Sequence, residues 1–356
     1  MMGERSIITG MKGRGNRKGL FDKQKWLFVK ANVMPAFRRL LLDRPGPMFV
    51  GLFLTRRCNL ECSYCFSRKN IKDPSLDEVK KRVDKIKEIG CNIIYFMGGE
   101  PTLRKDIVEI TRYCNDKGMF IVMNTNGRLL NKKMIDELSE AGMNSMVVSL
   151  DGVKKLKQSR KTLFDNPHLL SLLEHASCQE GMSITINTVL TGENTKDVIP
   201  LLIKASEHGL MMTTCLQTQP PSTFVDKGLN TRFSDEDAKK IHKLLDGLIE
   251  KRGEGYPLFE PIYCYKRMKE FLKGKYNWNC KAGRHFFSVD CDGSVSLCPE
   301  TKTLGIHISD IDKSYYQKYK RLFEKQLKKC NKACVENYAL CHSYYDDHKL
   351  RFLFNK

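Results

Sequence analysis

The sequence of 356 residues lacks any apolar run of the ~20 residues that a membrane-spanning helix requires. Its first residues, MMGERSIITGMKGRGNRKG, are basic but no apolar segment follows them, so they do not form a secretory signal peptide. Both absences predict a cytoplasmic protein, in which cysteines stay reduced. We therefore expect the 14 cysteines to hold metal rather than to build a disulfide framework.

Common motifs of nucleotide and metal sites are also missing. The sequence has no P-loop and no glycine-rich dinucleotide fingerprint, and its 8 histidines form no His-Glu-x-x-His or other paired pattern. The cysteines thus remain the candidate metal ligands. Charge of one sign is abundant: 61 Lys and Arg against 41 Asp and Glu give a net charge of +20. This excess favours an anionic neighbour, with a solvated lysine-rich surface as the alternative explanation.

From residue 48 onward, short β-rich runs alternate with amphipathic stretches. The expected strands are 48–55, 92–96, 120–124, 145–150, 183–190 and 210–215. The expected helices between them are 75–89, 105–117, 132–141, 167–180 and 195–208. A glycine follows each helix where a left-handed cap belongs, namely Gly90, Gly118, Gly142, Gly181 and Gly209. Six βα units in a row predict an α/β fold with a parallel sheet, a partial (β/α)6 barrel of the TIM type.

The pattern changes at both ends of this core. We expect four segments: a basic N-terminal segment at 1–47, the barrel core at 48–217, a linker with helices at 218–279, and a small cysteine-rich C-terminal module at 280–356. Within the N-terminal segment, KWLFVKANVMPAFRRLLLD at 25–43 has the spacing of an amphipathic helix that Pro35 would kink. This helix either lies on the inner face of a membrane as a peripheral contact or packs across the bottom of the barrel.

Three cysteines stand directly after the first expected strand, in the C-x3-C-x2-C triplet Cys58-Asn-Leu-Glu-Cys62-Ser-Tyr-Cys65. Three thiolates on one loop suit three irons of a [4Fe–4S] cube and leave the fourth iron open. A structural zinc site would need a fourth protein ligand, and no neighbouring residue is an obvious candidate.

This triplet, with Tyr64 before its last cysteine, resembles that of radical S-adenosylmethionine (radical SAM) enzymes. After the second strand, Gly98-Gly99-Glu100-Pro101 resembles the motif of that family for the methionine amino group. Two glycines allow the backbone to approach a ligand, and Glu100 supplies an anion for an ammonium. The resemblance assigns further cofactor contacts to Tyr64 and to polar residues at the carboxyl ends of strands, namely Asn124, Asn126, Ser149, Asp151 and Asn187.

The resemblance also implies a mechanism. The cluster held by Cys58, Cys62 and Cys65 binds S-adenosylmethionine, and one electron cleaves it to a 5′-deoxyadenosyl radical that abstracts hydrogen from an unreactive C–H bond. The electron is expected from a reduced flavodoxin- or ferredoxin-type donor.

A second cysteine group lies in the C-terminal module. Cys280 and Cys298 flank a predicted hairpin, strands 286–290 and 294–297 with an Asp-Gly turn, and this spacing resembles the opening of SPASM and "twitch" modules of radical SAM enzymes. Cys330, Cys334 and Cys341 follow as C-x3-C-x6-C. We expect a twitch-like module with one auxiliary [4Fe–4S] cluster on Cys280, Cys298 and two of the last three, with structural zinc as the rival and Cys291 as a weaker ligand. The remaining cysteines are expected to be small buried side chains: Cys91, Cys114, Cys178, Cys215 and Cys264.

Three functions compete for this sequence. The first is an enzyme that modifies a peptide or a cofactor precursor, although the N-terminal segment is shorter than the leader-binding domain of many peptide modifiers. The second is radical modification of an isoprenoid lipid or its polyol headgroup at a membrane. The third is a non-enzymatic iron–sulfur or zinc protein that binds nucleic acid. Such a protein would have no reason to carry Gly98-Gly99-Glu100-Pro101 and Ser149-Leu150-Asp151-Gly152 at strand ends, so no nucleic acid partner is expected. The terminal RFLFNK lacks the Gly-Gly-Arg tail of the molybdenum-cofactor cyclase, which argues against a pterin-forming enzyme.

Overall fold

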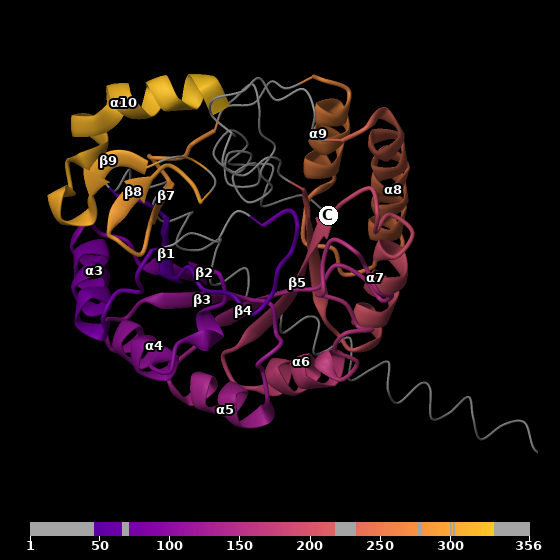
Figure 1. Cartoon of the computed structure of the whole chain (residues 1–356), viewed down its shortest axis with the longest axis horizontal. Helices are drawn as coiled ribbons and strands as arrows, with labels where there is room; N and C mark the ends of the chain where they lie inside the picture. The colour runs from indigo at the N-terminus through magenta and orange to yellow at the C-terminus, as the bar shows by residue number, and fades with distance from the viewer. Residues whose placement is uncertain are drawn as a thin grey trace, which may run out of the picture.

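The computed structural model describes residues 46–65, 71–217, 233–275, 280–299, 301 and 303–330 (Figure 1). The helix predicted at 25–43 lies outside these residues, as do Cys334, Cys341 and the side chain of Cys330. Among the residues described, no helix is long and apolar enough to cross a membrane.

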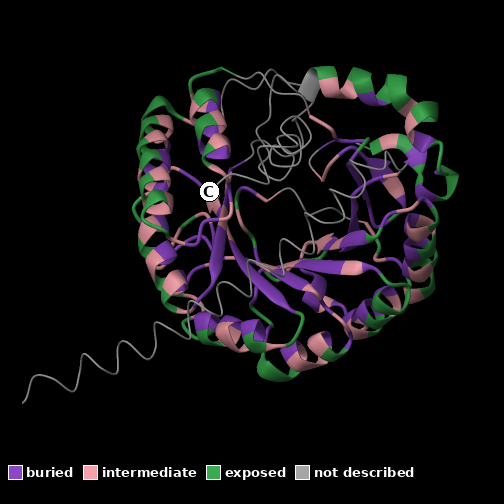
Figure 2. Cartoon of the chain, turned by 180° about the vertical axis from the view of Figure 1, so that it is seen from behind, coloured by how far each residue is buried: buried purple, intermediate pink, exposed green. Residues whose placement is uncertain are grey.

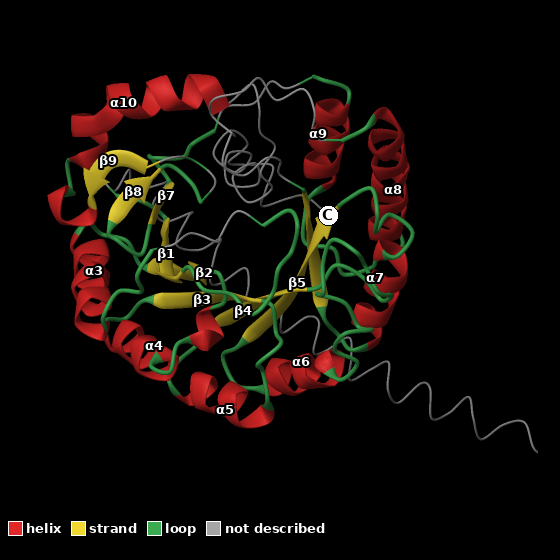
Figure 3. Ribbon diagram, viewed as in Figure 1, coloured by secondary structure: helices red, strands yellow, loops and turns green. Residues whose placement is uncertain are grey.

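A curved sheet of nine strands organises the part of the chain that the structure describes (Figure 3). Its first six strands run parallel and lie side by side in sequence order. They are β1 (Phe49–Thr55), β2 (Ile93–Gly98), β3 (Phe120–Thr125), β4 (Ser145–Ser149), β5 (Ser183–Leu190) and β6 (Met211–Leu216). The sheet does not close on itself, since β6 stands at one end of the order and β9 at the other. The predicted α/β fold, an open partial barrel, is confirmed.

Helices cover the convex side of this sheet, one after each of the first five strands (Figure 1). They are α3 (Leu76–Glu88), α4 (Ile107–Asp116), α5 (Lys132–Glu140), α6 (Leu169–Cys178) and α7 (Val198–Glu207). Each helix buries one apolar face in the core that it shares with the sheet. In Figure 2 the strands are mostly coloured as buried, whereas the outer faces of the helices are coloured as exposed. Local signals set the ends: Ser75 forms a capping box with Glu78 on α3, and the five glycines expected after the helices all have positive φ.

The C-terminal hairpin joins the same sheet. Strand β7 (Phe286–Val289) pairs in parallel with β1, and β8 (Ser294–Ser296) and β9 (Thr303–His307) continue the sheet in antiparallel fashion. The predicted hairpin is therefore present, and it packs on the barrel core rather than standing apart from it. Ring stacking of Phe49 on Phe286, with centroids 5.1 Å apart, contributes to this junction.

The other helices lie beyond the parallel strands. Helix α8 (Asp235–Gly253), which begins at the predicted cap Ser234, packs against α9 (Ile262–Leu272), and α10 (Tyr315–Cys330) follows the hairpin. Two short 3-10 turns, η2 (Pro101–Leu103) and η3 (Ile308–Asp310), complete the described elements.

The cysteines outside the two predicted clusters behave differently from one another. Cys91, Cys114 and Cys264 are fully buried, as expected for small apolar side chains. The expectation is wrong for Cys178, which is exposed because it is the last residue of α6. It is also wrong for Cys215, which is half-buried in β6.

Candidate active site

The cysteine triplet lies on the loop that leaves the carboxyl end of β1, and all three thiols are half-buried. The Cys65 N–H donates to the Cys62 carbonyl at 3.0 Å, and the Leu60 N–H lies 3.4 Å from the Cys58 sulfur. Burial raises the pKa of the Cys58 thiol; the Leu60 N–H opposes this, and charge on Glu100, Cys65 and Cys62 adds to it. The three thiols are thus close enough to influence one another electrostatically.

The donor set of this loop fits an iron–sulfur cluster. Three cysteines on one partly exposed loop provide the three thiolates that a [4Fe–4S] cube takes from the protein while one iron stays open. Within the described part of the chain, no three His, Cys, Asp or Glu side chains already converge as a metal-binding group. The loop therefore offers the right ligands without holding them in final coordination geometry.

The two glycines of the Gly98-Gly99 pair permit a close approach between β2 and the cysteine loop. The Gly99 N–H donates to the Thr55 carbonyl at 2.9 Å, and the Glu100 N–H donates to the Arg57 carbonyl at 2.8 Å. A Cβ on Gly98 would overlap the Thr55 carbonyl oxygen, and one on Gly99 would overlap that of Arg57. The glycines therefore make room for the backbone of the cysteine loop. This is a structural reason for the motif, in addition to the ligand contact that the sequence analysis expects.

Glu100 is fully buried and its carboxylate accepts four hydrogen bonds. Its Oε1 accepts from the backbone and hydroxyl of Thr102, at 3.1 and 2.6 Å, and from the Thr125 hydroxyl at 2.7 Å. Its Oε2 accepts from the Asn126 N–H at 2.7 Å. These donors join the ends of β2 and β3, with Pro101 buried at the start of η2. Glu100 thus joins the ends of β2 and β3. Its expected contact with the amino group of S-adenosylmethionine stays a prediction.

Asn126 connects the end of β3 to the cysteine loop. Its side-chain amide donates to Asn59 Oδ1 at 2.7 Å and lies 3.8 Å from the Cys58 sulfur. Asn124, two residues earlier, is half-buried in β3. The sequence analysis did not single out Asn59, although its position directly after Cys58 is a signal that could have found it.

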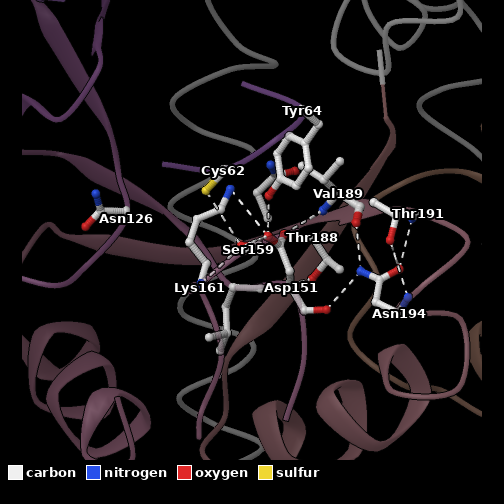
Figure 4. Close-up of polar contacts among 12 residues, drawn as sticks. Cys62, Tyr64, Asn126, Asp151, Ser159, Lys161, Thr188, Val189, Thr191 and Asn194 are labelled. Atoms are coloured by element: carbon white, nitrogen blue, oxygen red, sulfur yellow. Dashed lines mark hydrogen bonds and ion pairs between the residues drawn. The ribbon is translucent and has the colours of Figure 1, made fainter. Parts of the chain in front are cut away.

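Asp151 forms the centre of a buried network that reaches the cysteine loop from the other side (Figure 4). The Tyr64 hydroxyl donates to its Oδ2, and so does the Ser159 hydroxyl, at 2.7 Å. The Val189 N–H donates to its Oδ1 at 3.1 Å. Because Tyr64 belongs to the cysteine loop and Asp151 follows β4, this network fixes the loop to the sheet.

Lys161 completes the network, and the sequence analysis missed it. Its ammonium lies 3.5 Å from Asp151 Oδ2 and 4.9 Å from the centre of the Tyr64 ring. Burial alone would lower the pKa of Lys161, but the Asp151 carboxylate, with Tyr64 and Cys62, outweighs burial and raises this pKa well above its ordinary value. In the sequence Lys161 closes a run of basic residues, where it looks like one more solvated lysine.

Two more predicted residues lie on neighbouring strands. Ser149 at the end of β4 is paired in register with Asn187 of β5, and both are half-buried. The Asn187 amide lies 3.9 Å from the Cys215 sulfur on β6. The predicted cofactor contacts thus stand at the ends of neighbouring parallel strands, the position in which barrels of this kind carry their active sites.

The second cysteine group is only partly within the described chain. Cys280 precedes the hairpin and Cys298 follows β8, and both are half-buried. Cys291 is different: it is buried, its thiol donates to the Phe53 carbonyl at 3.4 Å, and burial raises its pKa to about 12. The Cys291 thiol is thus engaged with the backbone of β1, and its role as a weaker ligand stays a prediction.

An open parallel barrel whose first loop carries three cysteines is typical of enzymes built around an iron–sulfur cluster. A sequence model of the Radical SAM superfamily matches residues 52–205. The PqqA peptide cyclase of Bradyrhizobium diazoefficiens is 32% identical over 274 residues, 72% of this chain and 68% of that protein. The chain belongs to the radical SAM superfamily, whose enzymes use a [4Fe–4S] cluster and S-adenosylmethionine.

Other relatives agree on the family and the fold. Fe-coproporphyrin III synthase of Methanosarcina barkeri is 30% identical over 213 residues, and the match spans 57% of this chain but only 52% of that protein. Among solved structures, SuiB of Streptococcus suis matches with a TM-score of 0.58 and 16% identity, over 76% of this chain and 66% of SuiB. The anSMEcpe complex with AdoMet and the Kp18Cys peptide matches with a TM-score of 0.60 and 21% identity, over 86% of this chain and 98% of that one.

Proposed function

We propose that this enzyme cleaves S-adenosylmethionine reductively and directs the resulting radical at a C–H bond of a peptide or of a cofactor precursor. The observation that carries the proposal is the match to PqqA peptide cyclase over 72% of the chain. Structures similar in fold also include SuiB bound to its precursor peptide SuiA, and the relatives include AdoMet-dependent heme synthase of Methanosarcina barkeri. The substrate class thus follows from these relatives, while the specific substrate stays open.

In this proposal Cys58, Cys62 and Cys65 hold the cluster. When bound, the cluster and S-adenosylmethionine supply the reductive cleavage that yields the 5′-deoxyadenosyl radical. The chain itself positions the loop: Glu100 and Asn126 hold it from the β2 and β3 side, and Asp151 holds it from the β4 side. This bracing from two sides keeps the cysteine loop in one place relative to the strand ends.

The cofactor contacts are proposed from the same set of strand-end residues. The half-buried side chains of Asn124, Ser149 and Asn187 carry donors that suit ribose and carboxylate oxygens. The full proposed set is Tyr64, Gly98, Gly99, Glu100, Pro101, Asn124, Asn126, Ser149, Asp151 and Asn187. Lys161 is proposed to support this set without contacting the cofactor, because its ammonium neutralises the negative charge of Asp151.

We also propose that the C-terminal segment is a twitch-like module with one auxiliary [4Fe–4S] cluster. Its support is the hairpin of β7 and β8, which stands between Cys280 and Cys298 as the spacing of such modules requires. The remaining ligands would come from Cys330, Cys334 and Cys341. The electron donor and the membrane contact of residues 25–43 stay predictions.

Anaerobic reconstitution tests the proposal. Iron and sulfide are counted per chain, and 5′-deoxyadenosine is measured with S-adenosylmethionine and dithionite. Two clusters predict about eight irons per chain together with 5′-deoxyadenosine. About four irons plus one zinc would keep the core function and replace the auxiliary cluster by a structural zinc site. A chain with a correctly loaded first cluster that forms no 5′-deoxyadenosine with any candidate peptide or precursor would contradict the proposed reaction.

A further inference from the structure

A loop rich in cations lies between β4 and α6. This basic loop, residues 154–160, exposes four cationic side chains: Lys154, Lys155, Lys157 and Arg160. None of the four forms an ion pair within 4.0 Å with another residue that the structure describes. Of the acids packed against the loop, Asp151 pairs with Lys161, Asp197 is buried, and the exposed Glu193 accepts backbone N–H groups while keeping its charge. Because the four cations outnumber Asp197 and Glu193, the surface of the basic loop is positive.

An exposed aromatic side chain stands at the base of the basic loop. Phe164 is 64% exposed, the largest value among the exposed large apolar residues of the described chain. The two ends of the loop are joined by a β-bridge between Gly152 and Thr162, and the Phe164 N–H donates to the Val153 carbonyl at 2.9 Å. Phe164 thus lies beside the first cations of the loop. An aromatic anchor rimmed by charge is typical of a protein-binding surface.

The basic loop touches the cysteine loop directly. The Ser63 N–H donates to the Gln158 carbonyl at 3.0 Å, and the Ser159 hydroxyl lies 3.8 Å from the Cys62 sulfur. The same short segment is therefore exposed to solvent on one side and in contact with the candidate cluster ligands on the other. A partner that docks on it comes close to the cluster without entering the barrel.

The basic loop is held in a fixed shape. Asp197 accepts the backbone N–H groups of Val153 and Lys154, the latter at 2.7 Å. Glu193 accepts the N–H groups of Lys157 and Gln158, the latter at 3.0 Å. A surface whose backbone is fixed in this way loses little conformational entropy when a partner binds.

We propose that the basic loop and Phe164 form the docking surface for an acidic one-electron carrier protein. The proposal rests on the reductive cleavage proposed above, which consumes one external electron in each cleavage. The anionic hydroquinone of a flavodoxin gives one electron to the oxidised cluster and becomes the neutral semiquinone, so no proton is exchanged. A transient redox complex of this kind needs only a small interface, and opposite charge speeds its formation. The contact with Cys62 and Ser63 favours this partner over a nucleic acid, which does not need to approach the cluster, and the test below distinguishes it from an acidic peptide.

The test uses the reconstituted holoenzyme and anaerobic stopped-flow absorbance. The variant carries K154Q, K155Q, K157Q and R160Q, and cluster bleaching is followed with either flavodoxin hydroquinone or dithionite. At low ionic strength we expect the variant to be reduced by flavodoxin about tenfold more slowly than wild type, since steering accounts for factors of this size. Reduction by dithionite, which needs no protein docking, should stay within about twofold. Added salt should slow the wild type more than the variant.

Matched variants separate charge from structure. K154R, K155R and K157R keep the charge and should restore the flavodoxin rate. Phe164→Ala should slow flavodoxin but not dithionite. The control K132Q, K239Q and K243Q removes exposed lysines on α5 and α8 and should change neither rate.

Two results would overturn the docking surface. The first is an unchanged flavodoxin rate in the glutamine variant; if this variant has also lost binding of poly-glutamate, the surface belongs to an acidic peptide. The second is an equal loss with dithionite, which would mean that the cysteine loop itself is damaged. If dithionite reduces the cluster but no 5′-deoxyadenosine forms, the proposed function fails while the docking test stays valid.

Discussion

Arg56 and Asp290 lie 234 residues apart in the sequence and form a buried ion pair with hydrogen bonds of 2.7 and 2.6 Å. Arg56 stands two residues before Cys58, whereas Asp290 follows β7 of the C-terminal hairpin. The guanidinium also lies over the Phe53 ring, 3.7 Å from its centre. The start of the cysteine loop is therefore attached to the C-terminal hairpin as well as to the barrel.

This pair yields a stability prediction. Asp290→Ala removes the carboxylate that pairs with the buried Arg56 guanidinium, so we expect a loss of about 3–5 kcal/mol in the free energy of unfolding. Glu109→Ala, which breaks the exposed pair with Lys80, should cost at most about 1 kcal/mol. Urea unfolding of the reconstituted proteins measures both. Equal costs for the two substitutions would show that the buried pair has no special role.

The cysteine triplet gives a prediction about iron. Replacing Cys58, Cys62 and Cys65 by Ala should remove about four irons per chain and all 5′-deoxyadenosine formation, because one cluster loses every protein ligand. Cys178→Ala is the matched control, since this exposed cysteine should affect neither. Iron analysis and chromatography of the cleavage products test the pair. Cleavage by the triple variant would refute the assignment of the site.

The positions of the core elements follow from local patterns and were predictable. Strand 183–190 was expected at the bounds that β5 has, and the expected strand 48–55 differs from β1 by one residue. Hydrophobic runs, caps and glycines act over a few residues, so a single sequence carries this information. The motif residues at the strand ends were assigned through the resemblance to radical SAM enzymes, and their contacts with the cofactor stay predictions.

Long-range polar pairs were not predictable. Nothing near Lys161 in the sequence distinguishes it from Lys157, yet Lys161 is half-buried and pairs with Asp151, whereas Lys157 is exposed. The partnership of Arg56 with Asp290 depends on the parallel pairing of β1 with β7, which no local pattern encodes. Such contacts arise only when the fold brings distant segments together, and they are the ones that hold the cysteine loop.

Lys161 gives a test of the network around Asp151. Lys161→Met keeps most of the side-chain volume but leaves the Asp151 charge without its cation. We expect cleavage to slow by at least about tenfold at unchanged iron content, since hydrogen bonds to charged groups contribute about 1.5–3 kcal/mol. Lys161→Arg should restore most of the rate. If the Met variant keeps the wild-type rate, the cation is not needed to position the loop.

Glu260 predicts a dependence of stability on pH. It is fully buried, with the Thr214 N–H at 2.8 Å and the Tyr265 hydroxyl at 2.9 Å from its carboxylate. Burial raises its pKa above the ordinary 4.5, and these donors offset only part of the effect. A carboxyl of this kind stabilises the fold fully below its ordinary pKa and loses that contribution as pH rises through the folded value.

Glu260→Gln should therefore gain stability relative to wild type as pH rises from about 4.5 to about 8. The urea midpoints of both proteins across this range give the measurement, and Glu140→Gln, an exposed position on α5, serves as the control. A constant difference between Glu260→Gln and wild type at all pH values would mean that folding leaves the ionisation of Glu260 unchanged.

Gly99 tests whether backbone packing, rather than side-chain chemistry, sets the position of the cysteine loop. A Cβ at this residue would meet the Arg57 carbonyl, which no rotamer can avoid, so Gly99→Ala must push β2 and the loop apart. We expect a loss of cluster iron and of 5′-deoxyadenosine formation. Gly253→Ala, at the end of α8 with no atom within 4 Å of the added Cβ, should leave both unchanged and stabilise the helix by up to about 1 kcal/mol. We would measure the iron content, the product formation and the urea midpoint of both variants. If Gly99→Ala assembles a full cluster and forms product at the wild-type rate, the close contact between β2 and the loop is not what holds the cysteines in place.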